Sequence, residues 1–175
     1  MRKVAIVGAE SSGKTTLAGA LGRACNGVVA AEFARTYLEA HGPSYTEADL
    51  LTIAVAQARA EDAAMDLAAR NGQGLVVCDT DLITIRIWSE EKFGRCDPWT
   101  REASEHRHYD LWLLCRPDIP WEADPLRENP HDRERLFSVY GTMLKALGKP
   151  FVVLGGPRED RLRHALDAID GLEEG

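Results

Sequence analysis

The sequence predicts an α/β fold in which a parallel β-sheet is covered by helices on both faces. Five short apolar runs alternate along the chain with longer stretches that suit helices. Each run is almost continuously apolar, which is typical of strands buried on both faces. The gaps between the runs are long enough for the crossover helices that parallel strands need, so we expect three layers. The predicted strands span residues 3–7, 28–31, 75–78, 111–115 and 151–154.

The 175-residue chain has the composition of a single globular domain. Apolar residues make up 45% of it and charged residues 28%, which excludes wholesale disorder and fibrous repeats. No linker, internal repeat or low-complexity tract divides the sequence, so we expect one domain over residues 1–175. The net charge of −7 argues against nucleic acid as a partner, because affinity for phosphodiester backbones comes largely from clustered Lys and Arg.

Neither the N-terminus nor the cysteines point to export or to a membrane. The first apolar run stops at Gly8 and is too short for a signal-peptide core or a membrane span. The cysteines are too widely spaced for a CxxC pair, so we expect reduced thiols and a cytoplasmic protein. No exposed apolar stripe stands out, which leaves the oligomeric state open. The cysteines are Cys25, Cys78, Cys96 and Cys115.

The longest predicted helix spans residues 46–70, and the clearest irregular segment spans residues 116–130. In the helix, apolar residues recur close to one face, and Thr46 followed by Asp49 suits an N-terminal cap. In the irregular segment, four prolines and many charges exclude regular secondary structure. We expect this segment to belong to a mobile lid over about residues 116–135.

Residues 8–15 read GAESSGKT, which matches the phosphate-binding loop pattern GxxxxGK[ST]. The match lies directly after the first predicted strand and before a helix-compatible stretch. Gly8 and Gly13 let the backbone turn tightly, so that its N–H groups surround nucleotide phosphates. Lys14 would reach the β and γ phosphates, and the Thr15 hydroxyl would bind Mg²⁺. The predicted nucleotide-binding residues are Gly8, Glu10, Ser11, Ser12, Gly13, Lys14, Thr15 and Thr16.

Two acidic residues follow predicted strands and would lie beside this loop, because the carboxyl ends of parallel strands share one edge. Asp79 follows the run LVVC, the shape of a Walker B strand, and is a candidate Mg²⁺ ligand or the N-cap of the next helix. Glu32 follows the run VVAA and is a candidate catalytic base or a first-turn acid of the next helix. Arg35 lies one helical turn after Glu32, so an ion pair would hold that carboxylate and favour its ionised form.

The residues around the loop favour an ATP-dependent kinase. No NKxD or DxxG motif of GTPases is present, so ATP is the favoured nucleotide. One carboxylate to bind Mg²⁺ and one to accept a hydroxyl proton suit phosphoryl transfer to an alcohol. In the predicted lid, Arg127 would neutralise charge on the transferred group while closure excludes water. Arg133 and Arg135 fit that role or an exposed helix face. The predicted catalytic residues are Lys14, Glu32, Asp79 and Arg127, and the predicted metal ligands are Thr15 and Asp79.

Four stretches of the sequence carry a more specific signal. They read GAESSGKTT, EFAR, CDTDLITIRIW and YDLWLLCRPDIPWEADPLRENPHDRERLF. In order and spacing they resemble the ribosylnicotinamide kinase domain of the NadR family, over about residues 3–151. The resemblance implies a P-loop kinase fold with the strand order 2-3-1-4-5. It also implies phosphorylation of nicotinamide riboside by ATP, at the ribose 5′-hydroxyl, to give the mononucleotide in NAD biosynthesis.

The same resemblance implies roles for residues at the acceptor side of the site. Glu32 and Arg35 would face the ribose, Asp79 and Asp81 would line the acceptor and magnesium site, and part of the lid would contact the substrate. Phe33, Tyr37 and Trp88 are candidates to stack on the flat cationic pyridinium. The predicted substrate residues are Glu32, Phe33, Arg35, Tyr37, Asp81, Trp88, Trp121 and Asp124, and Arg127 is the predicted lid cation.

Two other functions fit the same sequence. One keeps the kinase fold and changes the acceptor to another nucleoside or small polyol, because specificity depends on pocket shape. The other is an ATP-binding regulatory switch with little turnover, whose lid ordering signals to a protein partner. Stimulation of ADP formation by a hydroxyl acceptor distinguishes the kinases from the switch.

We predict that Lys14→Ala abolishes nucleotide turnover and leaves the fold intact, because the motif predicts that Lys14 reaches the phosphates. Steady-state ADP formation measures the first effect, and thermal unfolding followed by circular dichroism measures the second. A variant that turns over at the normal rate would contradict this role for Lys14.

Overall fold

The computed structural model of the chain describes residues 1–122 and 131–173. Within this range the strands form one parallel sheet in the order β2-β3-β1-β4-β5, which confirms the predicted α/β fold and the implied strand order. The strand boundaries agree with the predicted runs to within one residue. The strands are β1 (Arg2–Val7), β2 (Val28–Ala30), β3 (Leu75–Asp79), β4 (Leu111–Cys115) and β5 (Phe151–Leu154).

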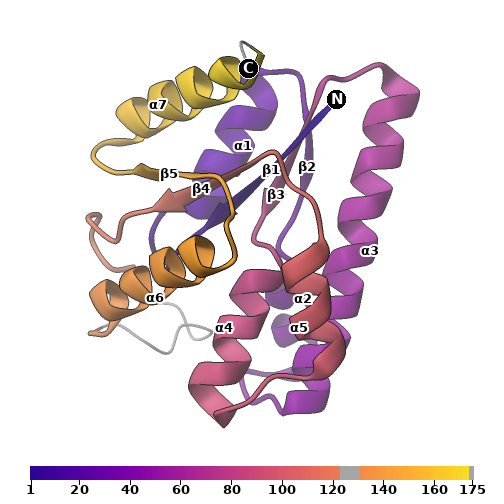
Figure 1. Cartoon of the computed structure of the whole chain (residues 1–175), viewed down its shortest axis with the longest axis vertical. Coiled ribbons are helices and arrows are strands. Elements are labelled where there is room, and N and C mark those ends of the chain that lie inside the picture. The colour runs from indigo at the N-terminus through magenta and orange to yellow at the C-terminus, as the bar shows by residue number, and fades with distance from the viewer. Residues whose placement is uncertain (123–130, 174–175) are drawn as a thin grey trace.

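Helices cover both faces of this sheet (Figure 1). They are α1 (Lys14–Ala24), α2 (Phe33–His41), α3 (Glu47–Asn71), α4 (Leu82–Phe93), α5 (Pro98–His106), α6 (Arg133–Ala146) and α7 (Arg158–Asp170), and the short 3-10 turn η1 (Gly171–Glu173) follows. On β1, Val4 and Ile6 pack with α1 and α7, whereas Ala5 and Val7 pack with α3, α4 and α6. This two-sided burial explains why the strands read as continuous apolar runs.

The register of the sheet brings distant parts of the sequence to one edge. Ile6 near the end of β1 pairs with Asp79 on β3 and with Leu113 on β4. On the other side of β3, Ala30 of β2 pairs with Cys78. The segments that leave β1, β2 and β3 therefore start side by side at the carboxyl edge of the sheet.

A smaller apolar cluster joins α2, α3 and α4 into a helical wall. Leu50 and Ile53 of α3 pack there with residues of α2 and α4. The helix α3 begins with the predicted cap: the Thr46 hydroxyl accepts the Asp49 N–H, and an Asp49 carboxylate oxygen accepts the Thr46 N–H at 2.7 Å. This reciprocal capping box satisfies two amides that the helix leaves unpaired.

The cysteines are free thiols, as predicted from their spacing. Cys78 and Cys115 are buried on β3 and β4, where they act as small apolar side chains. In residues 1–122 and 131–173, no helix combines the length and the apolar character needed to cross a bilayer.

A buried ion pair joins the start of β1 to the middle of α3. The Lys3 ammonium donates to a carboxylate oxygen of Glu61 at 2.7 Å, and Glu61 is fully buried. The same oxygen accepts the Tyr109 hydroxyl at 2.7 Å and lies 3.3 Å from the Arg107 guanidinium. These contacts link α3 to the sheet. Removal of one partner would leave an uncompensated charge in the core, so the link is costly to break.

We therefore predict that Glu61→Ala lowers the free energy of unfolding by about 3–5 kcal/mol, measured by urea denaturation at neutral pH. The control is Asp62→Ala, one residue later, which removes an exposed partner of Arg107 and is expected to cost about 1 kcal/mol or less. Equal losses in the two variants would contradict a special role for the buried pair.

Candidate functional site

The phosphate loop lies between β1 and α1, as its sequence predicts. Gly13 is the N-cap of α1 with a φ of 83°, and Ser11 also has a positive φ of 55°. The first turn of α1 holds no acidic residue. The unpaired N–H groups and the positive end of this helix are therefore available to an anion.

Gly8 has to be glycine because β4 ends directly against it. Its φ is 143°, and a Cβ atom there would lie only 2.7 Å from the carbonyl oxygen of Cys115. Any larger residue would push the loop and the end of β4 apart. The close approach fixes where the loop leaves the sheet.

Side chains of the loop itself hold its backbone. The Ser12 hydroxyl, fully buried, donates to the carbonyl oxygen of Ala9 at 2.7 Å. The Lys14 ammonium donates to the carbonyl oxygens of Gly8 and Ala9, at 3.0 Å each. Lys14 thus lies over its own loop, within the region that phosphates would enter.

Asp79 ends β3 directly beneath Thr15 of the loop. It is only 2% exposed, and burial raises the pKa of its carboxyl, while a hydrogen bond from Thr15 and the charges of Lys14 and Arg35 oppose that rise. Within the described chain its Oδ1 atom is buried without a hydrogen-bond partner. The alternative helix-cap role belongs instead to Asp81, which is the N-cap of α4.

Glu32 is the N-cap residue of α2, but its side chain makes no capping hydrogen bond. Burial raises the pKa of Glu32, Lys14 and Arg35 lower it, and the charge of Asp79 raises it further. A proton on Glu32 is therefore held more tightly than on a free glutamate. Two adjacent carboxyls with raised pKa values are typical of functional sites.

The oxygen atoms of Thr15 and Asp79 suit a magnesium ion. Mg²⁺ prefers oxygen ligands and is commonly held by one or two carboxylates together with substrate phosphates. The buried, unpartnered Oδ1 of Asp79 and the exposed Thr15 beside it provide such oxygens. The residues present therefore fit the ion that the phosphate loop implies.

A cavity of about 650 Å³, the main cavity, extends from the phosphate loop to the start of α7. Glu32 and Arg35 line one part of it, and Pro157 and Arg158 line another. Residues 119, 120 and 122, which precede α6, form part of its wall. Its volume is in the range of sites that enclose a small molecule.

A smaller cavity of about 330 Å³, the side cavity, adjoins the main one. The two share Glu10, Leu38 and Trp88 as walls, so a ligand in each would meet near the phosphate loop. The Lys92 ammonium lies 3.6 Å from the ring centroid of Tyr45. The side cavity is also lined by Ala9, Tyr45, Ile87, Glu91, Lys92, Arg135, Leu136 and Tyr140.

Comparison with protein families matches residues 3–161 to the AAA domain family. The chain belongs to this family. It is 30% identical over 160 residues to the trifunctional NAD biosynthesis/regulator protein NadR of Salmonella typhimurium, and 29% identical over 160 residues to that of Escherichia coli. These matches cover 87% of this chain and 38% of each relative, so the chain spans well under half the length of the relatives it matches.

Solved structures of NadR proteins are also similar to this chain. A NadR protein in complex with NR superposes with a TM-score of 0.79 at 26% identity, over 98% of this chain and 51% of that one. A NadR protein in complex with NAD and AMP-PNP superposes with a TM-score of 0.80 at 25% identity, over 98% and 49%. The predicted resemblance to the NadR family is confirmed. A deoxyadenosine kinase of M. mycoides, at 13% identity and a TM-score of 0.64 over 97% and 99%, shares the fold.

Most of the predicted nucleotide-binding residues line the main cavity together with three of the predicted substrate residues. Gly8 is the first residue of the loop and contacts the end of β4. Asp79 lies next to Thr15, which lines the main cavity. The predicted residues on the cavity wall are Glu10, Ser11, Ser12, Gly13, Lys14, Thr15, Thr16, Glu32, Arg35 and Trp88.

Asp81 does not line either cavity. It is 1% exposed; its Oδ1 accepts the N–H and the hydroxyl of Thr84, and its Oδ2 accepts the indole N–H of Trp112 at 2.8 Å. Burial raises the pKa of Asp81 to about 6. Thr80, with a φ of 83°, forms the sharp turn between Asp79 and Asp81, and the two acids have different partners. Asp81 therefore holds the start of α4 in this structure, instead of facing a ligand.

Two predicted aromatic residues also do not line either cavity. Phe33 and Tyr37 pack against the cluster of α2, α3 and α4. The Tyr37 hydroxyl donates to Asp49 at 2.6 Å, and its ring stacks on His41 with centroids 4.2 Å apart. Of the predicted stacking residues, only Trp88 stands on a cavity wall.

The predicted lid is only partly covered by the structure. Asp124 and Arg127 lie outside the described residues. Arg133 donates to the carbonyl oxygens of Ser11 at 3.3 Å and Ile119 at 3.0 Å, and its guanidinium lies 5.7 Å from the ring centroid of Trp121. Arg133 therefore contacts the phosphate loop. Arg135 pairs with Glu91 and Asp132 at the start of α6.

Several residues around the site carry no recognisable sequence signal. Tyr45 precedes α3 and Tyr140 lies within α6, so nothing in the sequence places them beside the phosphate loop. Arg161 lies in the charged stretch REDRLRH of α7, which reads as an exposed helix face, yet it is 3% exposed and lines the main cavity. Only the folded chain brings these residues to the site.

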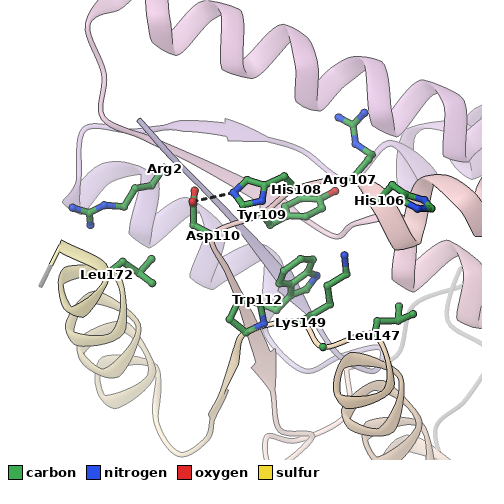
Figure 2. Close-up of a pocket in the computed structure, with 12 residues that line it drawn as sticks. Arg2, His106, Arg107, His108, Tyr109, Asp110, Trp112, Leu147, Lys149 and Leu172 are labelled. Carbon is green, nitrogen blue, oxygen red and sulfur yellow. Dashed lines mark hydrogen bonds and ion pairs between the residues drawn. The ribbon is translucent and has the colours of Figure 1, made fainter. Parts of the chain in front are cut away.

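A separate cavity of about 440 Å³ lies at the opposite, amino edge of the sheet (Figure 2). Its basic residues are held by their own chain: the Lys149 ammonium donates to the carbonyl oxygen of Glu105 at 2.6 Å, and Arg2 donates to a carbonyl at the end of α7 at 2.6 Å. In Figure 2 the guanidinium groups of Arg2 and Arg107 point in different directions. We therefore assign the candidate site to the carboxyl edge, where ligands bind in open α/β sheets.

We predict that Gly8→Ala weakens AMP-PNP binding at least tenfold, because its Cβ would displace the loop from β4. The matched control is Gly72→Ala at the end of α3, where φ is 66° and no atom lies within 4 Å of a built Cβ. The control is expected to cost about 1–2 kcal/mol of stability and to leave the affinity within twofold. Calorimetric titration with AMP-PNP measures both, and unchanged affinity in Gly8→Ala would contradict the tight fit.

Proposed function

We propose that this chain is an ATP-dependent kinase that phosphorylates the ribose 5′-hydroxyl of nicotinamide riboside and forms nicotinamide mononucleotide. The observation that carries the proposal is a phosphate loop flanked by Glu32 and Asp79, where two adjoining cavities meet. The NadR relatives, whose structures hold NR in one case and AMP-PNP in another, support both halves of the reaction.

The main cavity is the proposed ATP site. The amides at the start of α1 and the Lys14 ammonium would bind the phosphates, and the wall at Pro157 and Arg158 would enclose the rest of the nucleotide. Thr15 and Asp79 would hold Mg²⁺, which, when bound, neutralises charge on the phosphates. Asp79 is suited to this role because its Oδ1 atom is buried and has no hydrogen-bond partner among the described residues.

The side cavity is the proposed acceptor site. Nicotinamide riboside carries a flat, positively charged ring, and aromatic faces attract such cations. Trp88 and Tyr45 line this cavity, and Trp88 is the proposed stacking partner, because the Lys92 ammonium already lies over the Tyr45 ring. Glu10 on the wall of this cavity would add electrostatic attraction for the positively charged ring of nicotinamide riboside.

Glu32 is the proposed base. It lines the main cavity, and the charge of Glu10, a residue of the wall that both cavities share, raises its pKa, so a ribose hydroxyl entering from the side cavity would come within its reach. Its raised pKa brings it closer to neutral pH, where a carboxylate is a more effective proton acceptor. Arg35 would contact the ribose, and residues 119, 120 and 122 would exclude water from the main cavity. Arg127 is the proposed cation of the lid, and only the sequence supports this role.

We place the reaction in the cytoplasm, since the cysteines are free thiols and suit a reducing compartment. The acidic net charge of −7 supports a small-molecule substrate over a nucleic acid.

The deciding experiment measures ADP release from Mg-ATP with nicotinamide riboside, common ribonucleosides and deoxynucleosides as acceptors. We expect saturable stimulation by nicotinamide riboside and little by the others. Equal or faster rates with a deoxynucleoside would show that the chain is a kinase but that its acceptor is not nicotinamide riboside. A flat panel would favour the ATP-binding switch.

Glu32→Gln tests the base. We predict a fall in kcat of about 10²–10⁴-fold with the KM for ATP changed less than threefold, because the amide cannot accept the proton. In the wild type, kcat should fall as the pH drops through the raised pKa of Glu32, above the ordinary value of 4.5, as the carboxylate takes up a proton. That acid limb should be absent in the variant. Glu39→Gln, an exposed acid on the same helix, is the control, and near-normal turnover of Glu32→Gln would move the role to Asp79.

A further inference from the structure

The back of the phosphate loop is held by a guanidinium group from the other end of the chain. Arg161, in the first turns of α7, donates from Nη1 to the carbonyl oxygen of Ser12 at 2.7 Å. The two residues are 149 positions apart. No family motif named above includes Arg161, and the kinase reaction gives it no role.

Arg161 joins three separate segments at the carboxyl edge of the sheet. Besides Ser12 in the phosphate loop, its Nε donates to the carbonyl oxygen of Gly156 at 2.8 Å, in the turn between β5 and α7. Its Nη2 donates to the carbonyl oxygen of Arg116 at 3.1 Å and pairs with the carboxylate of Asp118, both in the segment after β4. Four acceptors thus surround one planar group.

This arrangement needs an arginine. The Arg161 side chain is 4% exposed, so its charge is out of water and depends on Asp118 for compensation. Only a guanidinium presents several donors in one fixed plane; an ammonium could bond some of these oxygens but not hold all three segments at once. Asp118 in turn accepts the N–H of Gly156 at 2.7 Å, which ties the same two segments together.

The contact with Ser12 acts on the peptide that follows it. The Ser12 carbonyl and the Gly13 N–H belong to one trans peptide unit, so they point in opposite directions. Holding the carbonyl on Arg161 fixes the Gly13 N–H on the other side, at the N-terminus of α1. A cation at the carbonyl also polarises the peptide and strengthens its N–H as a donor.

We propose that Arg161 is a positioning residue for nucleotide binding. Its guanidinium fixes the Ser12–Gly13 peptide of the phosphate loop in the phosphate-binding orientation and locks it to the segment 116–118 and the turn before α7. The proposal rests on nucleotide binding at the phosphate loop, which is part of the proposed function, and does not depend on the identity of the acceptor.

The test measures AMP-PNP affinity by calorimetry in Arg161→Ala, Arg161→Lys and wild type. We expect a loss of at least tenfold in Arg161→Ala and only partial recovery in Arg161→Lys. Added guanidinium ion at low millimolar concentration should restore affinity in Arg161→Ala, because it refills the space between the same oxygens, and should not improve the wild type. Arg163→Ala, an exposed position on the same helix paired with Asp160, is the matched control and should stay within twofold.

An AMP-PNP affinity of folded Arg161→Ala within twofold of wild type would overturn the proposal. So would a loss that guanidinium does not restore, which would assign Arg161 to fold stability instead. Should Arg161→Ala fail to fold, Asp118→Asn decides: a loss of threefold or more with an unchanged unfolding midpoint supports the proposal, and unchanged affinity overturns it. Failure of the acceptor screen would leave this readout intact, since no acceptor is needed.

Discussion

A phosphate loop functions only if its carbonyl groups are held on one side while its amide groups stay free on the other. Backbone hydrogen-bonding groups left unpaired inside a protein are costly, so each buried carbonyl needs a donor. In this chain the donors come from the loop itself and from two later helices. The donors are Ser12, Lys14, Arg133 and Arg161, and the carbonyls are those of Gly8, Ala9, Ser11 and Ser12. The loop is thereby connected to α6 and α7, and its shape depends on the whole sheet edge being assembled.

The same edge gathers the acidic groups. Parallel pairing of β3 with β1 sets Asp79 beside the loop, and β2 ends near enough for Glu32 to share its electrostatic environment. Burial raises the pKa of both carboxyls, and the charge of Lys14 opposes the rise in each case. One cation thus lies near two carboxyls with different surroundings: Asp79 is buried, whereas Glu32 is half-buried, makes no capping hydrogen bond and lines the main cavity. This difference suits one acid to binding a metal and the other to accepting a proton.

Local signals in the sequence predicted what depends on local structure. The strands follow from continuous apolar runs, the start of α3 from Thr46 and Asp49, and the phosphate loop from its glycines. Interactions between distant residues could not be read in this way. The adjacent acids Asp79 and Asp81 look alike in sequence, and only the indole of Trp112, on another strand, assigns Asp81 to the core. Arg161 lies in a highly charged helix, and its burial depends on Asp118, 43 residues earlier.

We propose that this edge of the sheet passes a phosphoryl group to a ribose hydroxyl and keeps water out. Phosphorus NMR of a reaction with Mg-ATP and nicotinamide riboside tests it directly, because ADP, inorganic phosphate and a nucleoside monophosphate give separate signals. We expect that nearly every ADP formed is matched by one mononucleotide carrying phosphate on its 5′-oxygen. ADP accompanied by an equal amount of inorganic phosphate, with no mononucleotide, would contradict it.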